Sequence, residues 1–382
     1  MFLARGERRY RESDHKTMTA DDKLLDAITN LAPKLLTTME AFEQVQRDMH
    51  PSRQEKLAEF IAPFEDELRT SFDSFTSMEF PEEIAAFVKR LIDGTTYSLR
   101  ACNGITNQGT EPFAAMKAMR AHCRAQEFIY PLANVLTPVS QYFLEKSARE
   151  NKDLLYKLNQ DRPGQPVGLL NAENDRDCRG GFTLYIPEYL DPTEQTSLVI
   201  VLHGGTGHGA DFLWSWLREA RTRGFILLSP TSQSDTWSLM GEDIDLKPLA
   251  AMIDFIKQQC TVDEEHILLT GMSDGGTYAL QAGLQDNSPF THLAPFSGVL
   301  HPEIQMMGRM QYAMERDIYL VHGTLDWMFP IETAYMAQAE LEAAGANLVF
   351  RPIEGLSHSF CRAEAPHVIN WFNPALKSPA ND

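Results

Sequence analysis

Residues 266–280 (HILLTGMSDGGTYAL) constrain the fold of this chain more than any other stretch. Three apolar residues at its start predict a short buried strand, and its last four residues predict the first turn of a helix. The turn between them places Ser273 in the pattern G-x-S-x-G, which is typical of a serine held on a sharp strand-to-helix turn. Glycines on both sides of the serine leave out the Cβ atoms that would clash where strand and helix cross. The alternative is a glycine-rich turn whose serine has no chemical role.

Around this turn, the second half of the chain alternates short apolar runs with amphipathic segments. Strands are predicted at residues 182–186, 197–202, 224–228, 267–269, 293–296, 318–321 and 348–352. Helices are predicted at residues 211–223, 246–259, 333–344 and 366–372. Such alternation favours an α/β fold with a mostly parallel sheet and helices on both faces. Ligands bind such sheets beyond the carboxyl ends of the strands, which is where Ser273 lies.

Three more segments follow predicted strands at the same edge of the sheet. A His-Gly-Gly turn after residues 197–202 suits an oxyanion hole, in which the backbone N–H of Gly205 would act with that of Asp274. Asp326 follows the strand at 318–321, and His358 follows the strand at 348–352. An acid and a histidine placed in this way fit the two partners that a nucleophilic serine needs.

These motifs, HGGTGHG, GMSDGG, HGTLDWMFP and EGLSHS, resemble those of the α/β-hydrolase superfamily. They are most similar to the phospholipase/carboxylesterase family and the related bacterial feruloyl and polyhydroxybutyrate esterases, over roughly residues 180–375. The resemblance implies Ser273 as nucleophile, His358 as general base and then acid, and Asp326 as the residue that orients His358. It implies hydrolysis of small-molecule carboxylic esters without a metal or organic cofactor.

Residues 20–160 show no strand-like alternation and follow the helical period instead. Apolar residues of the first predicted helix recur at steps of three and four: Leu24, Ile28, Leu31, Leu35, Met39, Phe42 and Val45. Further helices are predicted at residues 57–75, 81–92, 112–129 and 139–158, of which the helix at 81–92 is expected to end near Gly94. Together they predict an all-α bundle. Its Phe and Met stripes are interpreted as core rather than as a lipid-binding surface, and its role is not evident.

Composition sets the limits of the predicted domains. Residues 1–19 are polar and predict a flexible tail, and residues 161–181, rich in Pro, Gly, Asn and Asp, predict a linker before a catalytic domain at 182–382. The chain has five cysteines without metal-site spacing, and neither a signal peptide nor a run of 18 apolar residues. We therefore expect a cytoplasmic protein.

The charge is strongly acidic and unevenly distributed. Residues 161–382 hold 13 Lys and Arg against 29 Asp and Glu, out of a net charge of −19 for the whole chain. Such a half repels polyanions, which argues against nucleic acid and stable anchoring to anionic membranes. A homo-oligomer formed through the helical domain stays open.

Several alternatives accompany these predictions. Trp237, Trp327 and Met328 are predicted to contact the substrate near the active edge, although packing between the two halves is an equal interpretation. His203 and His208, with Asp211, form too small a set on a glycine loop to predict a metal site. The same triad would also serve a peptidase or an acyl-thioesterase. In a further alternative, the helical half binds a partner protein and the hydrolase half is vestigial.

Overall fold

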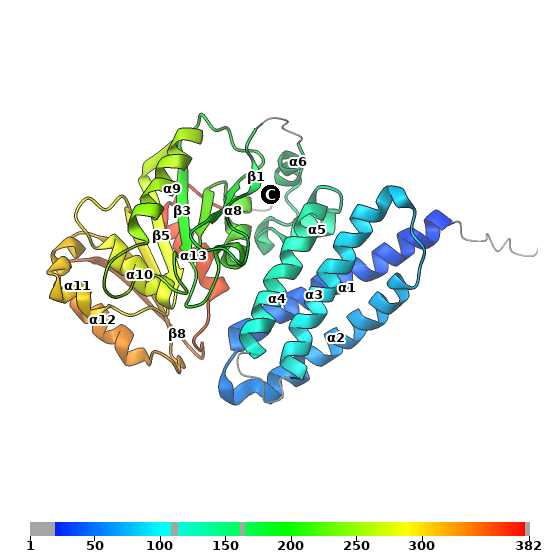
Figure 1. Cartoon of the computed structure of the whole chain (residues 1–382), viewed down its shortest axis with the longest axis horizontal. Helices are drawn as coiled ribbons and strands as arrows, with labels where there is room; N and C mark the ends of the chain where they lie inside the picture. Colours follow the sequence, from blue (N-terminus) through cyan, green and yellow to red (C-terminus); the bar gives the residue numbers. More distant parts are fainter. Residues whose placement is uncertain (1–19, 108–113, 161–164, 379–382) are drawn as a thin grey trace, which may run out of the picture.

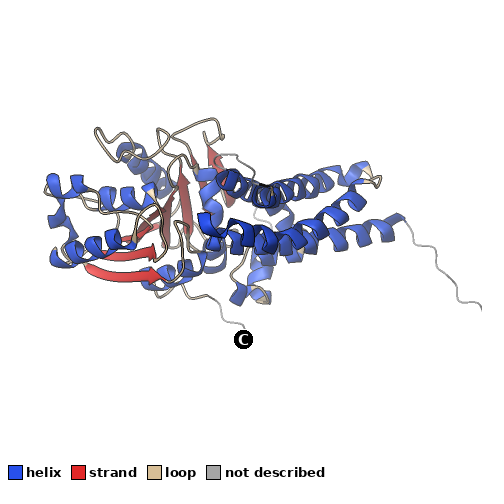
Figure 2. Cartoon of the chain, turned by 90° about the horizontal axis from the view of Figure 1, so that it is seen from below, coloured by secondary structure: helices blue, strands red, loops and turns tan. Residues whose placement is uncertain are grey.

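The computed structural model describes residues 20–107, 114–160 and 165–378. The predicted tail at 1–19 lies outside them. An all-helical region stands beside a sheet flanked by helices (Figures 1 and 2). The helical region contains α1 (Ala20–Asp48), α2 (Gln54–Thr76), α3 (Ala85–Thr106), α4 (Ala114–Ile129), α5 (Thr137–Tyr142) and α6 (Lys152–Leu158). No helix within the described ranges combines the length and apolar character needed to cross a membrane.

Helix α1 buries the face that its apolar period predicts. Leu31, Leu35, Met39 and Phe42 are at most 1% exposed. Pro33 lies within the first half of α1 without ending it, as the helix extends from Ala20 to Asp48. The hydrophobic stripe therefore determines the helix despite the cost of an internal proline, because burial of a helix face stabilises it more than propensity does.

Two predictions for the helical region were wrong. Helix α3 runs through Gly94 instead of ending near it, and a Cβ at this position would overlap Cγ2 of Ile129 on α4. The glycine thus permits close packing of two helices rather than marking a helix end. The single helix predicted at 139–158 is divided into α5 and α6, since Asn151 caps α6 by accepting a hydrogen bond from the N–H of Leu154 at 2.9 Å.

The second region contains an eight-stranded sheet in the order β1-β2-β4-β3-β5-β6-β7-β8. Its strands are β1 (Gly168–Ala172), β2 (Phe182–Ile186), β3 (Thr196–Leu202), β4 (Ile226–Pro230), β5 (Val262–Met272), β6 (His292–Phe296), β7 (Asp317–Gly323) and β8 (Asn347–Ile353). All neighbours from β4 to β8 pair in parallel, while β1 and β2 are antiparallel. The predicted fold class, a mostly parallel sheet preceded by an all-helical region, is confirmed.

Strand β1 lies inside the segment predicted as a linker, residues 161–181. Its five residues pair antiparallel with β2 in a continuous register from Gly168 to Ala172. Only one edge of β1 is paired and its residues are mostly half-buried, so its sequence lacks the apolar run that marks the inner strands. The division of the chain into separate domains stays a prediction.

Alternate residues of the inner strands pack into two cores on opposite faces of the sheet. Leu198, Ile200 and Leu202 of β3 pack in one core with α9 (Leu246–Gln259), α10 (Asp274–Gly283) and α12 (Ile331–Ala343). Val199 and Val201 pack in the other core with α8 (Leu217–Arg223) and α13 (Ala365–Phe372). Both faces of the sheet are therefore covered, as in other parallel sheets.

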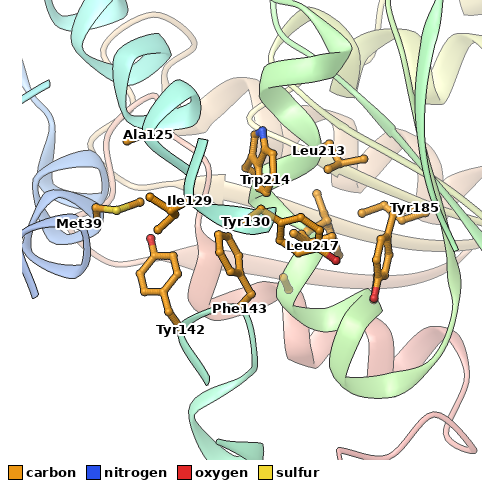
Figure 3. Close-up of a cluster of buried hydrophobic side chains, with 14 of the residues drawn as sticks. Met39, Ala125, Ile129, Tyr130, Tyr142, Phe143, Tyr185, Leu213, Trp214 and Leu217 are labelled. Carbon is orange, nitrogen blue, oxygen red and sulfur yellow. The ribbon is translucent and has the colours of Figure 1, made fainter. Parts of the chain in front are cut away.

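The second of these cores continues into the helical region without a break. Figure 3 shows Met39, Ile129 and Phe143 of the helical region in one cluster with Trp214 and Leu217 of the sheet region. The ring of Trp214 lies 5.7 Å from each of the rings of Tyr130 and Phe143. The helical region is therefore packed onto the sheet region through a shared apolar core.

Candidate active site

Ser273 stands at the junction of β5 and α10 with a φ of 56° and a ψ of −120°. This conformation is strained for a residue with a side chain. A Cβ on Gly271 would lie 2.5 Å from the carbonyl carbon of Gly275, and one on Gly275 would overlap the carbonyl of Leu202. The N–H of Ser273 donates to the carbonyl of Phe296 on β6 at 2.9 Å. The sharp turn predicted from the sequence is present.

Ser273, His358 and Asp326 form one hydrogen-bonded chain. The Oγ of Ser273 lies 2.9 Å from Nε2 of His358, and Nδ1 of His358 lies 2.8 Å from Oδ2 of Asp326. They come from the carboxyl ends of β5, β8 and β7, so the parallel sheet brings together residues far apart in the chain. An imidazole held in this way presents one nitrogen to the serine while the carboxylate fixes its tautomer.

Asp326 is buried and held by its own loop. Its Oδ1 accepts hydrogen bonds from the N–H groups of Met328 at 3.0 Å and Phe329 at 2.8 Å. Burial raises its pKa, but the hydrogen bonds from His358 and the Phe329 N–H outweigh this, so the pKa of Asp326 is lower than usual. The carboxylate is therefore ionised at neutral pH.

The two residues predicted as oxyanion donors lie against each other. A Cβ on Gly205 would lie 2.7 Å from Oδ2 of Asp274, which accepts a hydrogen bond from the Thr236 hydroxyl at 2.5 Å. Asp274 is the first residue of α10, where backbone N–H groups have no partner within the helix. The arrangement is compatible with an oxyanion hole formed by the backbone N–H groups of Gly205 and Asp274, which stays a prediction.

Two arginines hold the glycine loop that carries Gly205. Arg120 of α4 donates to the carbonyl of Thr206 at 2.6 Å, and Arg179 donates to the carbonyl of Gly207 at 2.7 Å. The helical region thus contacts the loop directly. It contacts the histidine loop as well, through a 3.2 Å hydrogen bond from Arg53 to the carbonyl of Gly355.

The nearby histidines are engaged in structural hydrogen bonds. His203 contacts the carbonyl of Gly204 at 2.7 Å and accepts from the N–H of Ser232 at 3.1 Å. His208 contacts the carbonyl of Cys178 at 3.2 Å and accepts from the N–H of Ala210. Among the described residues, no group of three or more His, Cys, Asp or Glu is arranged to hold a metal ion.

A cavity of about 810 Å³ adjoins the triad and extends between the two regions. His358, Gly205 and Met272 line it on the side of the sheet. Its opposite wall comes from α1 and α4 of the helical region, including Met116 and Met119. Met116 and Met119 belong to the stripes that the sequence interpretation assigned to the core, but they are half-buried and line this space. Their i, i+3 spacing on α4 places them on one face of the helix, but periodicity does not reveal whether such a face packs in the core or lines a cavity.

The predicted substrate contacts are not brought to this cavity. Trp237 is 3% exposed, stacks on Tyr278 and donates from Nε1 to the carbonyl of His203 at 2.7 Å, so it is a core residue. Trp327 and Met328 lie on the surface beside Asp326, 54% and 46% exposed, and do not line the cavity. The prediction for Trp237 was wrong, because an apolar ring near a strand end is as easily core as pocket.

Comparison with known proteins agrees with this architecture. Residues 242–374 match the model of the phospholipase/carboxylesterase family. The match confirms the predicted resemblance to the phospholipase/carboxylesterase family over this part of the chain. It contains Ser273, Asp326 and His358, but not the helical region or the loop of Gly205.

Two curated proteins are similar over part of the chain. A bifunctional acetylxylan esterase/xylanase of Neocallimastix patriciarum is 28% identical over 148 residues, which are 37% of this chain and 21% of that protein. Acyl-protein thioesterase 1 of Neurospora crassa is 22% identical over 219 residues, 49% of this chain and 89% of the relative. The matched part thus spans about a fifth of the first relative's length.

Solved esterase structures are also similar to part of the chain. A thermostable esterase matches with 19% identity and a TM-score of 0.41, covering 53% of this chain and 61% of the other. Thermogutta terrifontis esterase 2 matches with 17% identity and a TM-score of 0.44, covering 58% of this chain and all of the other.

Proposed function

We propose that the protein is a serine hydrolase that cleaves carboxylic esters through an acyl-enzyme. The observation that carries the proposal is the hydrogen-bonded chain Ser273–His358–Asp326, with distances of 2.9 and 2.8 Å. Ser273 is the nucleophile, His358 the general base and then acid, and Asp326 the residue that orients His358.

The chemistry follows from these side chains. A serine hydroxyl is a weak nucleophile at neutral pH, so His358 takes its proton as Oγ attacks the ester carbonyl. The N–H groups of Gly205 and Asp274 stabilise the oxyanion of the tetrahedral intermediate. His358 then gives the proton to the departing alcohol, which leaves Ser273 acylated. Water activated by His358 attacks the acyl-enzyme, releases the carboxylic acid and restores the serine.

A fluorophosphonate probe tests the nucleophile directly, because it phosphonylates the activated serine of a serine hydrolase. We expect covalent labelling of the wild-type protein and no labelling of Ser273→Ala, with hydrolysis of p-nitrophenyl acetate lost in parallel. Ser359→Ala is the matched control, since Ser359 lines the same cavity one residue after His358. Labelling that survives Ser273→Ala, or that Ser359→Ala alone abolishes, would overturn the assignment.

Acyl thioesters are the second candidate substrate class. The similarity to acyl-protein thioesterase 1 supports testing them, because the same triad serves oxygen and sulfur esters. Comparing kcat/KM for matched oxygen and thiol esters of one acyl group decides between the two. A cytoplasmic location and oligomerisation through the helical region are further proposals, tested by cell fractionation and by mass measurement in solution.

A further inference from the structure

The cavity beside the triad is built by both halves of the chain. Its walls include α1 and α4 on one side and, on the other, α8, the loops after β3 and β8, and Met272 at the end of β5. At about 810 Å³ it is in the range of pockets that enclose drug-sized ligands. An acetyl group bound at Ser273 would leave most of this space empty, so the size points to a larger substrate.

The charged groups around the cavity are largely paired with one another. Glu43 of α1 forms a two-pronged ion pair with Arg218 of α8 at 2.7 and 2.8 Å, and Arg223 pairs with Glu145. Burial raises the pKa of the Glu219 carboxyl to about 7, so a large part of it is neutral at neutral pH. A charged ligand would have to displace these pairs, whereas an apolar ligand would leave them intact.

The lining also offers apolar and adaptable side chains next to the reacting groups. Met272 precedes Ser273 in the chain, and Phe360 comes two residues after His358. Met116 and Met119 face them from α4. Methionine side chains adapt to irregular apolar ligands and make favourable contacts with them.

We propose that this cavity binds the acyl part of the substrate, and that α1 and α4 act as its second wall, so that the enzyme prefers large apolar acyl groups. The inference rests on the proposed ester hydrolysis. In that reaction the alcohol leaves first and water must take its place, whereas the acyl part stays attached to Ser273 through both steps. The cavity between the helical region and the sheet region therefore suits the acyl part, which stays bound to Ser273.

The test compares p-nitrophenyl octanoate with p-nitrophenyl acetate in wild type and in Met119→Trp. We expect wild type to have the higher kcat/KM for octanoate. The indole should narrow the cavity beside α4 and lower kcat/KM for octanoate at least about 10-fold more than kcat/KM for acetate, since misfits of one methylene already cost 10-fold or more. Met336→Trp is the matched control, because Met336 is 59% exposed on α12, away from the cavity.

Circular dichroism would detect misfolding of Met119→Trp, and a second variant keeps the inference testable in that case. Met119→Ala enlarges the cavity and should shift the preferred acyl chain to greater length. An equal fall for both esters, a wild-type preference for acetate, or a chain-length profile that neither variant changes would overturn the inference. Failure of ester hydrolysis itself looks different, because wild type would then cleave neither ester.

Discussion

Asp326 shows how much of the candidate site depends on single hydrogen bonds. It fixes one nitrogen of His358 at 2.8 Å, and two backbone N–H groups of its own loop hold its other oxygen. The environment of this carboxyl thus favours the ionised form that the proposed mechanism requires.

Replacing Asp326 with asparagine should lower kcat for p-nitrophenyl acetate by up to about 10⁴-fold, while the unfolding midpoint changes little. The amide keeps the size of the side chain but favours the wrong tautomer of His358, an effect known from serine proteases. Steady-state kinetics and thermal unfolding together check the prediction. Asp317→Asn is the control, because Asp317 lies at the start of β7, at the opposite end from Asp326. An unaltered rate in Asp326→Asn would contradict the acid role proposed for Asp326.

At the scale of elements, the packing of α3 on α4 rests on a residue without a side chain. Gly94 is buried in the middle of α3 against Ile129 of α4. In an isolated helix, alanine is favoured over glycine by about 1 kcal/mol. Here the added methyl group would overlap Ile129, so packing and propensity act in opposite directions.

Gly94→Ala should therefore destabilise the protein, by about 1–3 kcal/mol, because overpacking outweighs the gain in helix propensity. Urea denaturation measures the change in the free energy of unfolding. Ile129→Leu removes the methyl group on the β-carbon, so the double variant should recover part of the loss, giving a coupling in the mutant cycle. A Gly94→Ala protein more stable than wild type would show that α3 and α4 are less closely packed.

Elements whose signal is local were predicted well from the sequence, and those that depend on distant partners were not. The helix at 246–259 was placed correctly because its apolar period lies within the segment itself. Gly94 was taken for a helix end because its partner, Ile129, is 35 residues away. Strand β1 was missed because its pairing with β2, rather than its own sequence, makes it a strand.

The same distinction applies to the candidate site at the scale of the whole molecule. Ser273, Asp326 and His358 each follow a strand of one parallel sheet, so the topology implied their meeting. The cavity wall on α1 and α4 could not be predicted, because it depends on how the helical region docks. That docking relies on pairs such as Glu43 and Arg218, which are 175 residues apart.

The ion pair of Glu43 and Arg218 should be a large contributor to this docking. Burial alone would raise the pKa of Glu43, but Arg218 and Arg362 lower it to about 2 from its ordinary 4.5. A lowered acid pKa means that the stabilisation is complete above pH 4.5 and is lost as pH falls from there to about 2. The shift corresponds to about 3 kcal/mol.

Glu43→Gln should accordingly lower the free energy of unfolding by about 3 kcal/mol at pH 7, because it leaves Arg218 buried without a counter-charge. The difference from wild type should shrink as pH falls toward 2, since wild-type Glu43 then becomes protonated. Denaturant titrations between pH 2 and pH 7 measure both effects. Glu40→Gln is the matched control on the same helix, because its ion pair with Arg149 is more exposed and should contribute at most about 1 kcal/mol. Equal losses in the two variants would contradict a special role for Glu43 in holding the helical region over the cavity.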